Sequence, residues 1–455
     1  MEVLRRLKRN GFFQSELLGA ARTNRTSREA DRRMTGRGME FDTGRRRGAT
    51  SRRQMLSLSG GAVLAALGTA ACGLDGNGSS SGPSAPDSSS APGKVSAPPA
   101  SGVLAANVNQ SLEKIDYAEL KAVSGTWIRG FYLMSDADQG NPATQTGFAK
   151  LLQATADGYG TVLTMKFQYR NQPMPTPGSP AMKTALARLD KVLAAAMGKV
   201  DILTVGNEPF FETSKTDRQT PRINAFYEAL ALHTANYRQA HFGANCKTKI
   251  YMGALTALYR PGAQTAQTRR WMTFTAHTSP IAGVDIHPHV PSPAAAQKYV
   301  DYVLPFLRSD QKFLATEFSL VQLWKQHMND PVNTAFASSH GIAKGTSVWQ
   351  VIKDATQHPF DEQEWNDFLL SNPWYAANKN FLTDQMRRFR STGKLAVASY
   401  GITQDMAMSK DFGPHKTPWV LNSLFCPNVC KPELSGLPGR NRTWCRQFRA
   451  LQHPR

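Results

Sequence analysis

From Val103 onward, short apolar runs alternate with longer stretches of helical periodicity. The apolar runs are nearly continuous, which is typical of parallel strands that helices cover on both faces. Each run except the last is followed by sequence with helical periodicity. The segments that we expect to be strands are 102–108, 126–134, 161–168, 200–206, 249–255, 283–290, 312–318 and 394–402.

Eight strands that alternate with helical sequence predict an α/β fold, a closed (β/α)₈ TIM barrel. The stretch between the seventh and eighth strands, 319–393, is far longer than an ordinary connection, and we expect a helical insert there. An open doubly wound sheet is the alternative. No Gly-rich phosphate loop follows the first strand, so a dinucleotide-binding fold is disfavoured.

Charge is concentrated at the start of the chain. The 455 residues carry a net charge of +20, and residues 1–53 contribute +9 of it, with 15 Lys+Arg against 6 Asp+Glu. The remaining positive charge is spread without a dense basic block. We therefore do not expect this chain to bind nucleic acid.

The basic leader has the parts of an export signal. Arg52 and Arg53 precede an apolar run, 55–67, that ends in small residues and Cys72. This order resembles the twin-arginine signal of bacteria. "TAAC" resembles a lipoprotein box, although Thr69 stands where such boxes prefer Leu, so Cys72 is a candidate lipidation site and membrane tether. An uncleaved anchor helix is the alternative.

A segment of Gly, Ser, Pro and Ala follows Cys72. It has almost no large apolar residue and predicts a disordered tether. We therefore expect a leader over 1–72, the tether over 73–102 and one folded domain over 103–455. This organisation predicts a protein outside the bacterial cytoplasm, either secreted or lipid-anchored at the cell surface.

Four further cysteines lie in the expected domain. Outside the cytoplasm they could form two disulfides, and the sequence leaves their pairing open. A zinc site would need paired short spacings, and "CPNVC" supplies only one. The four residues are Cys246, Cys426, Cys430 and Cys445.

Two glutamates follow strands of the expected barrel. Glu208 comes directly after the fourth strand, in "GNEP", and Glu317 lies near the end of the seventh, 109 residues later. Barrel chemistry occurs at the carboxyl ends of the strands, so both side chains should face one mouth. Two carboxyl groups, one protonated and one ionised, can together cleave a glycosidic bond.

These motifs resemble those of glycoside hydrolase clan A, the retaining (β/α)₈-barrel glycosidases. The resemblance covers the barrel alone and assigns no family within the clan. It implies that Glu208 is the acid/base, that Glu317 is the nucleophile, and that Asn207 binds a sugar hydroxyl. Arg129, on the second strand, matches the Arg that clan members often place beside the nucleophile.

The resemblance is looser on strands six and eight. His287 matches the clan's His, but His289 stands where a Tyr is usual, and Tyr400 replaces a Trp on strand eight. These departures leave the sugar, the linkage, and internal or terminal cleavage unassigned. We also expect Phe210 and Trp324, which follow the two glutamates, to contact substrate.

Two other functions stay open at this point. His287 and His289 could bind a metal at the same mouth, although we find no convincing further ligands in the sequence. A sugar-binding surface protein without turnover would keep the same barrel. For the glycosidase we expect a carbohydrate substrate, a monomer, and no metal or other cofactor, because two carboxylates and a water suffice.

Overall fold

The computed structural model describes residues 98–109 and 111–452. The predicted leader and nearly all of the tether lie outside these residues, so export, lipidation of Cys72 and the domain boundaries stay predictions. Within the described ranges, no helix is long and apolar enough to span a lipid bilayer.

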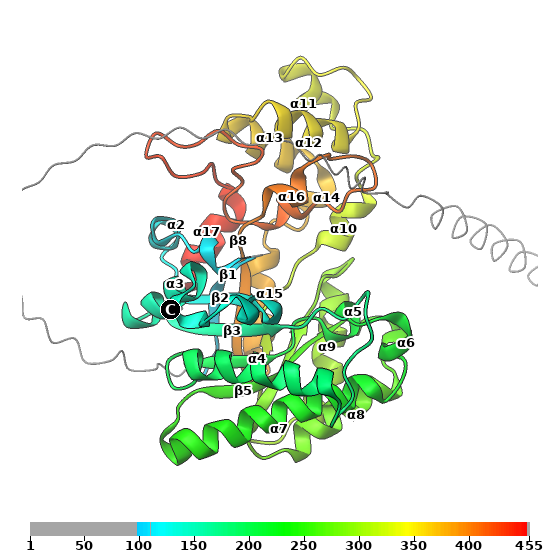
Figure 1. Ribbon diagram of the computed structural model, residues 1–455. Coiled ribbons are helices and arrows are strands. Elements are labelled where there is room, and N and C mark those ends of the chain that lie inside the picture. The colour runs from blue at the N-terminus through cyan, green and yellow to red at the C-terminus, as the bar shows by residue number, and fades with distance from the viewer. Residues whose placement is uncertain (1–97, 110, 453–455) are drawn as a thin grey trace, which may run out of the picture. The chain divides into compact units, whose positions relative to one another are not determined.

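Eight parallel strands form a closed barrel, in which each strand pairs with its neighbours along the chain and β1 pairs with β8 (Figure 1). The predicted TIM barrel is thus confirmed, and the open sheet is wrong. The strands are β1 Val103–Val108, β2 Trp127–Leu133, β3 Gly160–Lys166, β4 Ile202–Val205, β5 Lys249–Thr256, β6 Ile281–His287, β7 Lys312–Ala315 and β8 Leu395–Thr403.

Helical segments connect the strands, as the periodicity predicts. The α-helices are α2 Tyr117–Ala122, α3 Thr146–Ala156, α4 Pro180–Ala196, α5 Pro209–Glu212, α6 Lys215–Arg218, α7 Arg222–Phe242, α8 Ala266–His277, α9 Pro293–Val303, α10 Val321–Gln326, α11 Thr334–Ser339, α12 Val348–Gln357, α13 Glu362–Ser371, α14 Pro373–Ala376, α15 Phe381–Ser391, α16 Met406–Ser409 and α17 Arg442–Gln452. The 3₁₀ turns are η2 Leu112–Lys114, η3 Met134–Gln139, η4 Pro142–Thr144, η5 Gly243–Asn245, η6 Pro261–Ala263, η7 Leu304–Phe306 and η8 Trp419–Asn422.

Side chains of alternate strand residues point into the barrel. On β2, Trp127 belongs to a small apolar cluster at the floor, Arg129 lies buried above it, and Phe131 reaches a pocket at the mouth. The polar side chains of the barrel interior therefore lie above an apolar layer. The floor cluster consists of Val103, Ala105, Trp127, Val162, Ile202, Tyr251, Leu314, Ala396 and Val397.

The expected insert between β7 and β8 is present as helices α10 to α15. Figure 1 shows α11, α12 and α13 close together, with α16 from the segment after β8 beside them. The stretch between β8 and α17, residues 404–441, is a second long excursion, which the sequence did not single out. It supplies part of the pocket wall described below.

The four described cysteines are free thiols. Cys426, Cys430 and Cys445 are buried near the carboxyl end of the chain, and Cys246 is half-buried. Burial raises the pKa of Cys445 to about 12, which keeps this thiol protonated. The structure therefore does not contain the two disulfides that the cysteine count suggested.

Glu119, on α2, predicts a pH dependence of stability. Its side chain is buried and accepts a hydrogen bond from Thr403 Oγ1 at 2.9 Å, and burial raises its pKa to about 7. A carboxyl with a raised folded-state pKa contributes stability below its unfolded pKa and loses it as the pH rises. We expect Glu119→Gln to increase the free energy of unfolding by about 1–3 kcal/mol at pH 8 and by little at pH 5.

Urea denaturation at both pH values measures this difference. Glu113→Gln is the matched control, since Glu113 lies in the same segment but is exposed. An equal gain in both variants, or a gain that does not depend on pH, would contradict the assignment to Glu119.

Candidate active site

The turn after β4 places Asn207 and Glu208 at the barrel mouth. Gly206 has a φ of +99°, and a Cβ there would lie 2.7 Å from Tyr227 Cε1, so this turn requires glycine. Pro209 then begins the single-turn helix α5, with Glu208 as its N-cap residue. The "GNEP" motif thus forms a tight turn between the buried strand β4 and the short helix α5.

Glu317 lies two residues beyond β7, among cationic partners. Its Oε1 is 2.6 Å from Arg129 Nη1, and its Oε2 is 3.4 Å from His289 Nε2. Burial alone would raise the pKa of Glu317, but the charges of His287 and Arg129 lower it well below its ordinary value. Glu317 is therefore ionised near neutral pH, as a nucleophile must be.

His287, at the end of β6, lies between the two glutamates. Its Nδ1 is 3.4 Å from Glu208 Oε1 and 3.9 Å from Glu317 Oε2. Its Nε2 is 2.9 Å from Thr316 Oγ1, which donates to Asp285. Burial alone would lower the pKa of His287, but the charge of Glu317, together with Asp285 and Glu208, raises it to about 10. His287 is thus a cation that both carboxylates can share.

His289 contacts Glu317 although it replaces the expected Tyr. Its Nδ1 is 2.8 Å from Ser319 Oγ, and its ring meets Trp419 edge-on with the centroids 4.8 Å apart. His289 and Ser319 also form a backbone bridge between the ends of strands six and seven. The ring is therefore held so that Nε2 faces the carboxylate.

Arg129 joins three elements beneath the two glutamates. Besides Glu317, Nη1 donates to Asn107 Oδ1 at 3.0 Å, Nη2 to Asn207 Oδ1 at 2.7 Å, and Nε to Thr164 Oγ1 at 3.2 Å. Its side chain is fully buried. This planar fork fixes the positions of Glu317 and Asn207 relative to each other.

These groups line a cavity of about 410 Å³ at the carboxyl ends of the strands. Aromatic side chains form part of its wall, with Phe131, Tyr259, Tyr299 and Trp419 beside the two glutamates and the two histidines. The sequence did not predict that these four aromatic residues line the cavity. Phe131 could have been found, because it lies two residues after Arg129 on one strand; nothing near Trp419 in the sequence signals its place. Phe211, Asn109, Lys166, Arg260, Gln322 and Met408 also line the cavity.

The structure corrects three of the expected substrate contacts. Tyr400 points away from the barrel interior and packs against Phe318 and Trp444 in the outer core. Trp324 is fully buried, and its Nε1 donates to Asn422 Oδ1 at 2.9 Å. Phe210 packs against Trp271, and its neighbour Phe211 lines the cavity instead. Each of these residues lies on or just after a strand in the sequence, but its side chain packs into the core and does not line the cavity.

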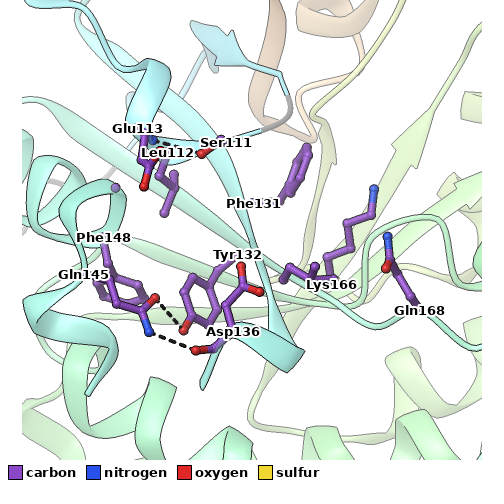
Figure 2. Close-up of a pocket in the computed structure, with 12 residues that line it drawn as sticks. Ser111, Leu112, Glu113, Phe131, Tyr132, Asp136, Gln145, Phe148, Lys166 and Gln168 are labelled. Carbon is purple, nitrogen blue, oxygen red and sulfur yellow. Dashed lines mark hydrogen bonds between the residues drawn. The ribbon is translucent and has the colours of Figure 1, made fainter. Parts of the chain in front are cut away.

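A second cavity of about 380 Å³ adjoins the first. Phe131 and Lys166 line both cavities, and Figure 2 shows them together with Tyr132, Asp136 and Gln145 around the second one. Tyr132 donates to Gln145 Oε1 at 2.9 Å, which fixes part of this wall. The mouth of the barrel therefore offers a concave surface that continues beyond the two glutamates.

The structure supplies a third candidate metal ligand that the sequence did not suggest. Three ligand atoms lie within 4.8 Å of one another, one each from Glu208, His287 and His289. Three protein ligands with an open fourth position are typical of catalytic zinc. However, metal binding would require neutral His287, whose raised pKa opposes the loss of its proton.

A scan against protein-family models finds no match for the chain, and neither does a search of curated proteins. Solved structures with similar folds exist at low identity. A thermostable mutant of a xylanase from Cellvibrio japonicus is 13% identical, with 78% of this chain and 97% of that chain covered and a TM-score of 0.46.

Two further solved structures are similar at the same level. Xylanase B from Clostridium stercorarium F9 is 13% identical, with 76% of this chain and 96% of that one covered and a TM-score of 0.46. A GH113 β-1,4-mannanase is 9% identical, with 78% and 99% covered and a TM-score of 0.38. At such TM-scores these likenesses add nothing to the fold assignment, which rests on the strand pairing of the chain itself.

Proposed function

We propose that this chain is a retaining glycoside hydrolase that acts by a two-glutamate double displacement. One observation carries the proposal. Both Glu208 and Glu317 contact the His287 ring at the barrel mouth, whereas Arg129 forms an ion pair with Glu317 and not with Glu208. The two carboxylates are therefore in unequal environments. Unequal partners are what acid and nucleophile roles require.

The shared histidine also limits the distance between the carboxylates. Glu208 Oε1 and Glu317 Oε2 lie 3.4 and 3.9 Å from one atom, His287 Nδ1. These two oxygens are thus less than about 7.5 Å apart, which accommodates the retaining separation of about 5–5.5 Å and lies below the upper part of the inverting range of about 6.5–9.5 Å.

In the proposed first step, Glu317 attacks the anomeric carbon while Glu208 donates its proton to the departing oxygen. The covalent bond to Glu317 replaces the glycosidic bond. Glu208, now ionised, removes a proton from water, and this water releases the sugar from Glu317. Arg129 and His287 hold the Glu317 carboxylate in place throughout.

The walls of the cavities support a carbohydrate substrate. Aromatic rings suit the C–H faces of sugars, and Phe131 and Trp419 border the pocket that holds both carboxylates. The second cavity continues beyond Phe131 and Lys166. This continuity supports a polysaccharide or an extended glycoside as substrate.

A metal-dependent hydrolase is the second candidate, and the cluster of Glu208, His287 and His289 favours it. In that reading Glu208 would be a ligand and could not donate a proton to a leaving group. The two candidates therefore predict opposite responses to a chelator.

Screening the purified barrel on a panel of polysaccharides and aryl glycosides, with and without EDTA, tests the proposal. We expect turnover that EDTA leaves unchanged. Loss of turnover in EDTA, restored by Zn²⁺, would support the metal-dependent hydrolase. Binding to a polysaccharide without turnover on any substrate would support a sugar-binding surface protein.

A further inference from the structure

The side chain of Glu212 is a buried carboxylate next to the catalytic pocket. The proposed reaction does not use this carboxylate. Glu212 ends helix α5, and the residue is 7% exposed. Its Oε1 accepts from Asn207 Nδ2 at 2.9 Å and from Lys166 Nζ at 3.0 Å. Its Oε2 makes no hydrogen bond with any described residue, so its contacts are concentrated on one oxygen.

The partners of Asn207 permit only one orientation of its amide. Arg129 Nη2 can only donate, so it requires the amide oxygen, at 2.7 Å. The Glu212 carboxylate can only accept, so it requires the amide nitrogen. Asn207 lines the catalytic pocket, and Nδ2 keeps a second hydrogen for a ligand there.

Lys166 supports the ionised form of Glu212. Burial raises the pKa of Glu212, and the Lys166 ammonium and the Asn207 amide both oppose this rise. Lys166 Nζ also lies 4.5 Å from the centroid of the Phe131 ring, which holds it at the border between the two cavities. The Lys166–Glu212 ion pair therefore holds in place the carboxylate that accepts from the Asn207 amide.

We infer that Glu212 is a positioning residue, which holds the Asn207 amide so that Nδ2 presents a hydrogen to a substrate hydroxyl. This inference rests on the proposed function, because it assigns a sugar as the ligand of Asn207. Glu212 touches no reacting atom and acts through Asn207. Partners that orient metal-ligating side chains contribute about 10–100-fold to affinity or activity, and we expect an effect of similar size for the partner of a sugar-binding amide.

A double-mutant cycle tests the inference, with turnover measured on the best substrate of the panel. Glu212→Met removes the acceptor of Asn207 Nδ2, and we expect kcat to fall by about 10-fold or more with a smaller change in KM. Glu212→Gln can keep its amide oxygen toward the two donors Asn207 and Lys166, so it should lose less than Glu212→Met. In the Asn207→Ala background, Glu212→Met should cost less than about 2-fold, because its target is gone.

Asp217→Asn is the matched control. Asp217 is equally buried in the neighbouring helix α6, but it bonds to Met174 N at 2.9 Å and pairs with Arg222, away from the pocket. Its variant should keep kcat. A loss in Asp217→Asn as large as the loss in Glu212→Met, or losses for Glu212→Met and Asn207→Ala that simply multiply, would overturn the inference.

A second measurement needs no substrate. The side-chain amide resonance of Asn207, identified by its absence in Asn207→Ala, should shift in Glu212→Met and stay in place in Asp217→Asn. An unchanged resonance in Glu212→Met would overturn the inference even if no substrate is found. A shifted resonance in a protein that turns over no glycoside would keep the positioning role and reject the proposed function.

Discussion

Glu317→Ala is expected to abolish turnover, with a loss on the order of 10⁴-fold or more, because no other group can form the covalent intermediate. Azide should restore part of the turnover, since it fits the space left by the carboxylate and attacks the anomeric carbon directly. That single displacement gives a glycosyl azide of inverted configuration. The configuration, read by NMR, is the measurement.

Glu208→Ala should fail in a different way. Glu317 remains, so substrates with good leaving groups still form the covalent intermediate, and a burst of the leaving group is expected. Azide then attacks from the face that water would use, and the product keeps its configuration. The wild-type protein in azide is the control. Products of swapped stereochemistry would mean that the two roles are reversed.

Arg129→Met is expected to have the largest effect on stability. It removes four hydrogen bonds and leaves the Glu317 carboxylate without its nearest cation, at a cost of about 3–5 kcal/mol in the free energy of unfolding. Turnover should fall by about 10²–10³-fold, because Glu317 and Asn207 lose their common anchor. Urea denaturation and kinetics measure the two losses.

Two further variants separate charge from geometry at Arg129. Arg129→Lys keeps the charge but cannot reproduce the planar fork, so it should recover stability better than turnover. Adding Glu317→Gln to Arg129→Met removes the carboxylate that has lost its nearest cation and should restore part of the lost stability. A double variant that is less stable than Arg129→Met would contradict the claim that the Arg129–Glu317 ion pair causes the loss.

The barrel could be predicted from the sequence because its signal is local and repeated. Each buried strand is a short apolar run, and the predicted ranges agree with the observed strands to within a few residues. The helical stretch after the first strand is less regular than its periodicity indicates, since residues 111–123 divide into η2 and α2, with Ser111 and Asp116 as separate caps. A second capping residue within one periodic stretch marks such a division.

The polar part of the site was predictable for the same reason, because strand ends place Glu208, Glu317 and His287 at one mouth, and Arg129 lies on β2 below them. The aromatic walls were not. Tyr400 and Trp324 lie close to the mouth in sequence but face the outer core, where Trp444 and Tyr375 pack against them. Which face an aromatic residue takes depends on helices distant in sequence, and these leave no local signal.

The closure of the barrel has a consequence for the newly made chain. Val103 pairs with Val397, and Gln452, at the end of α17, donates to the backbone oxygen of Leu104 at 3.0 Å. Figure 1 shows α17 beside β1 and β8. The first strand of the barrel to be synthesised therefore finds one of its two partner strands, β8, only after the other strands have been made. Until then one edge of β1 is open to pairing with other chains, so closure of the barrel follows the synthesis of β8.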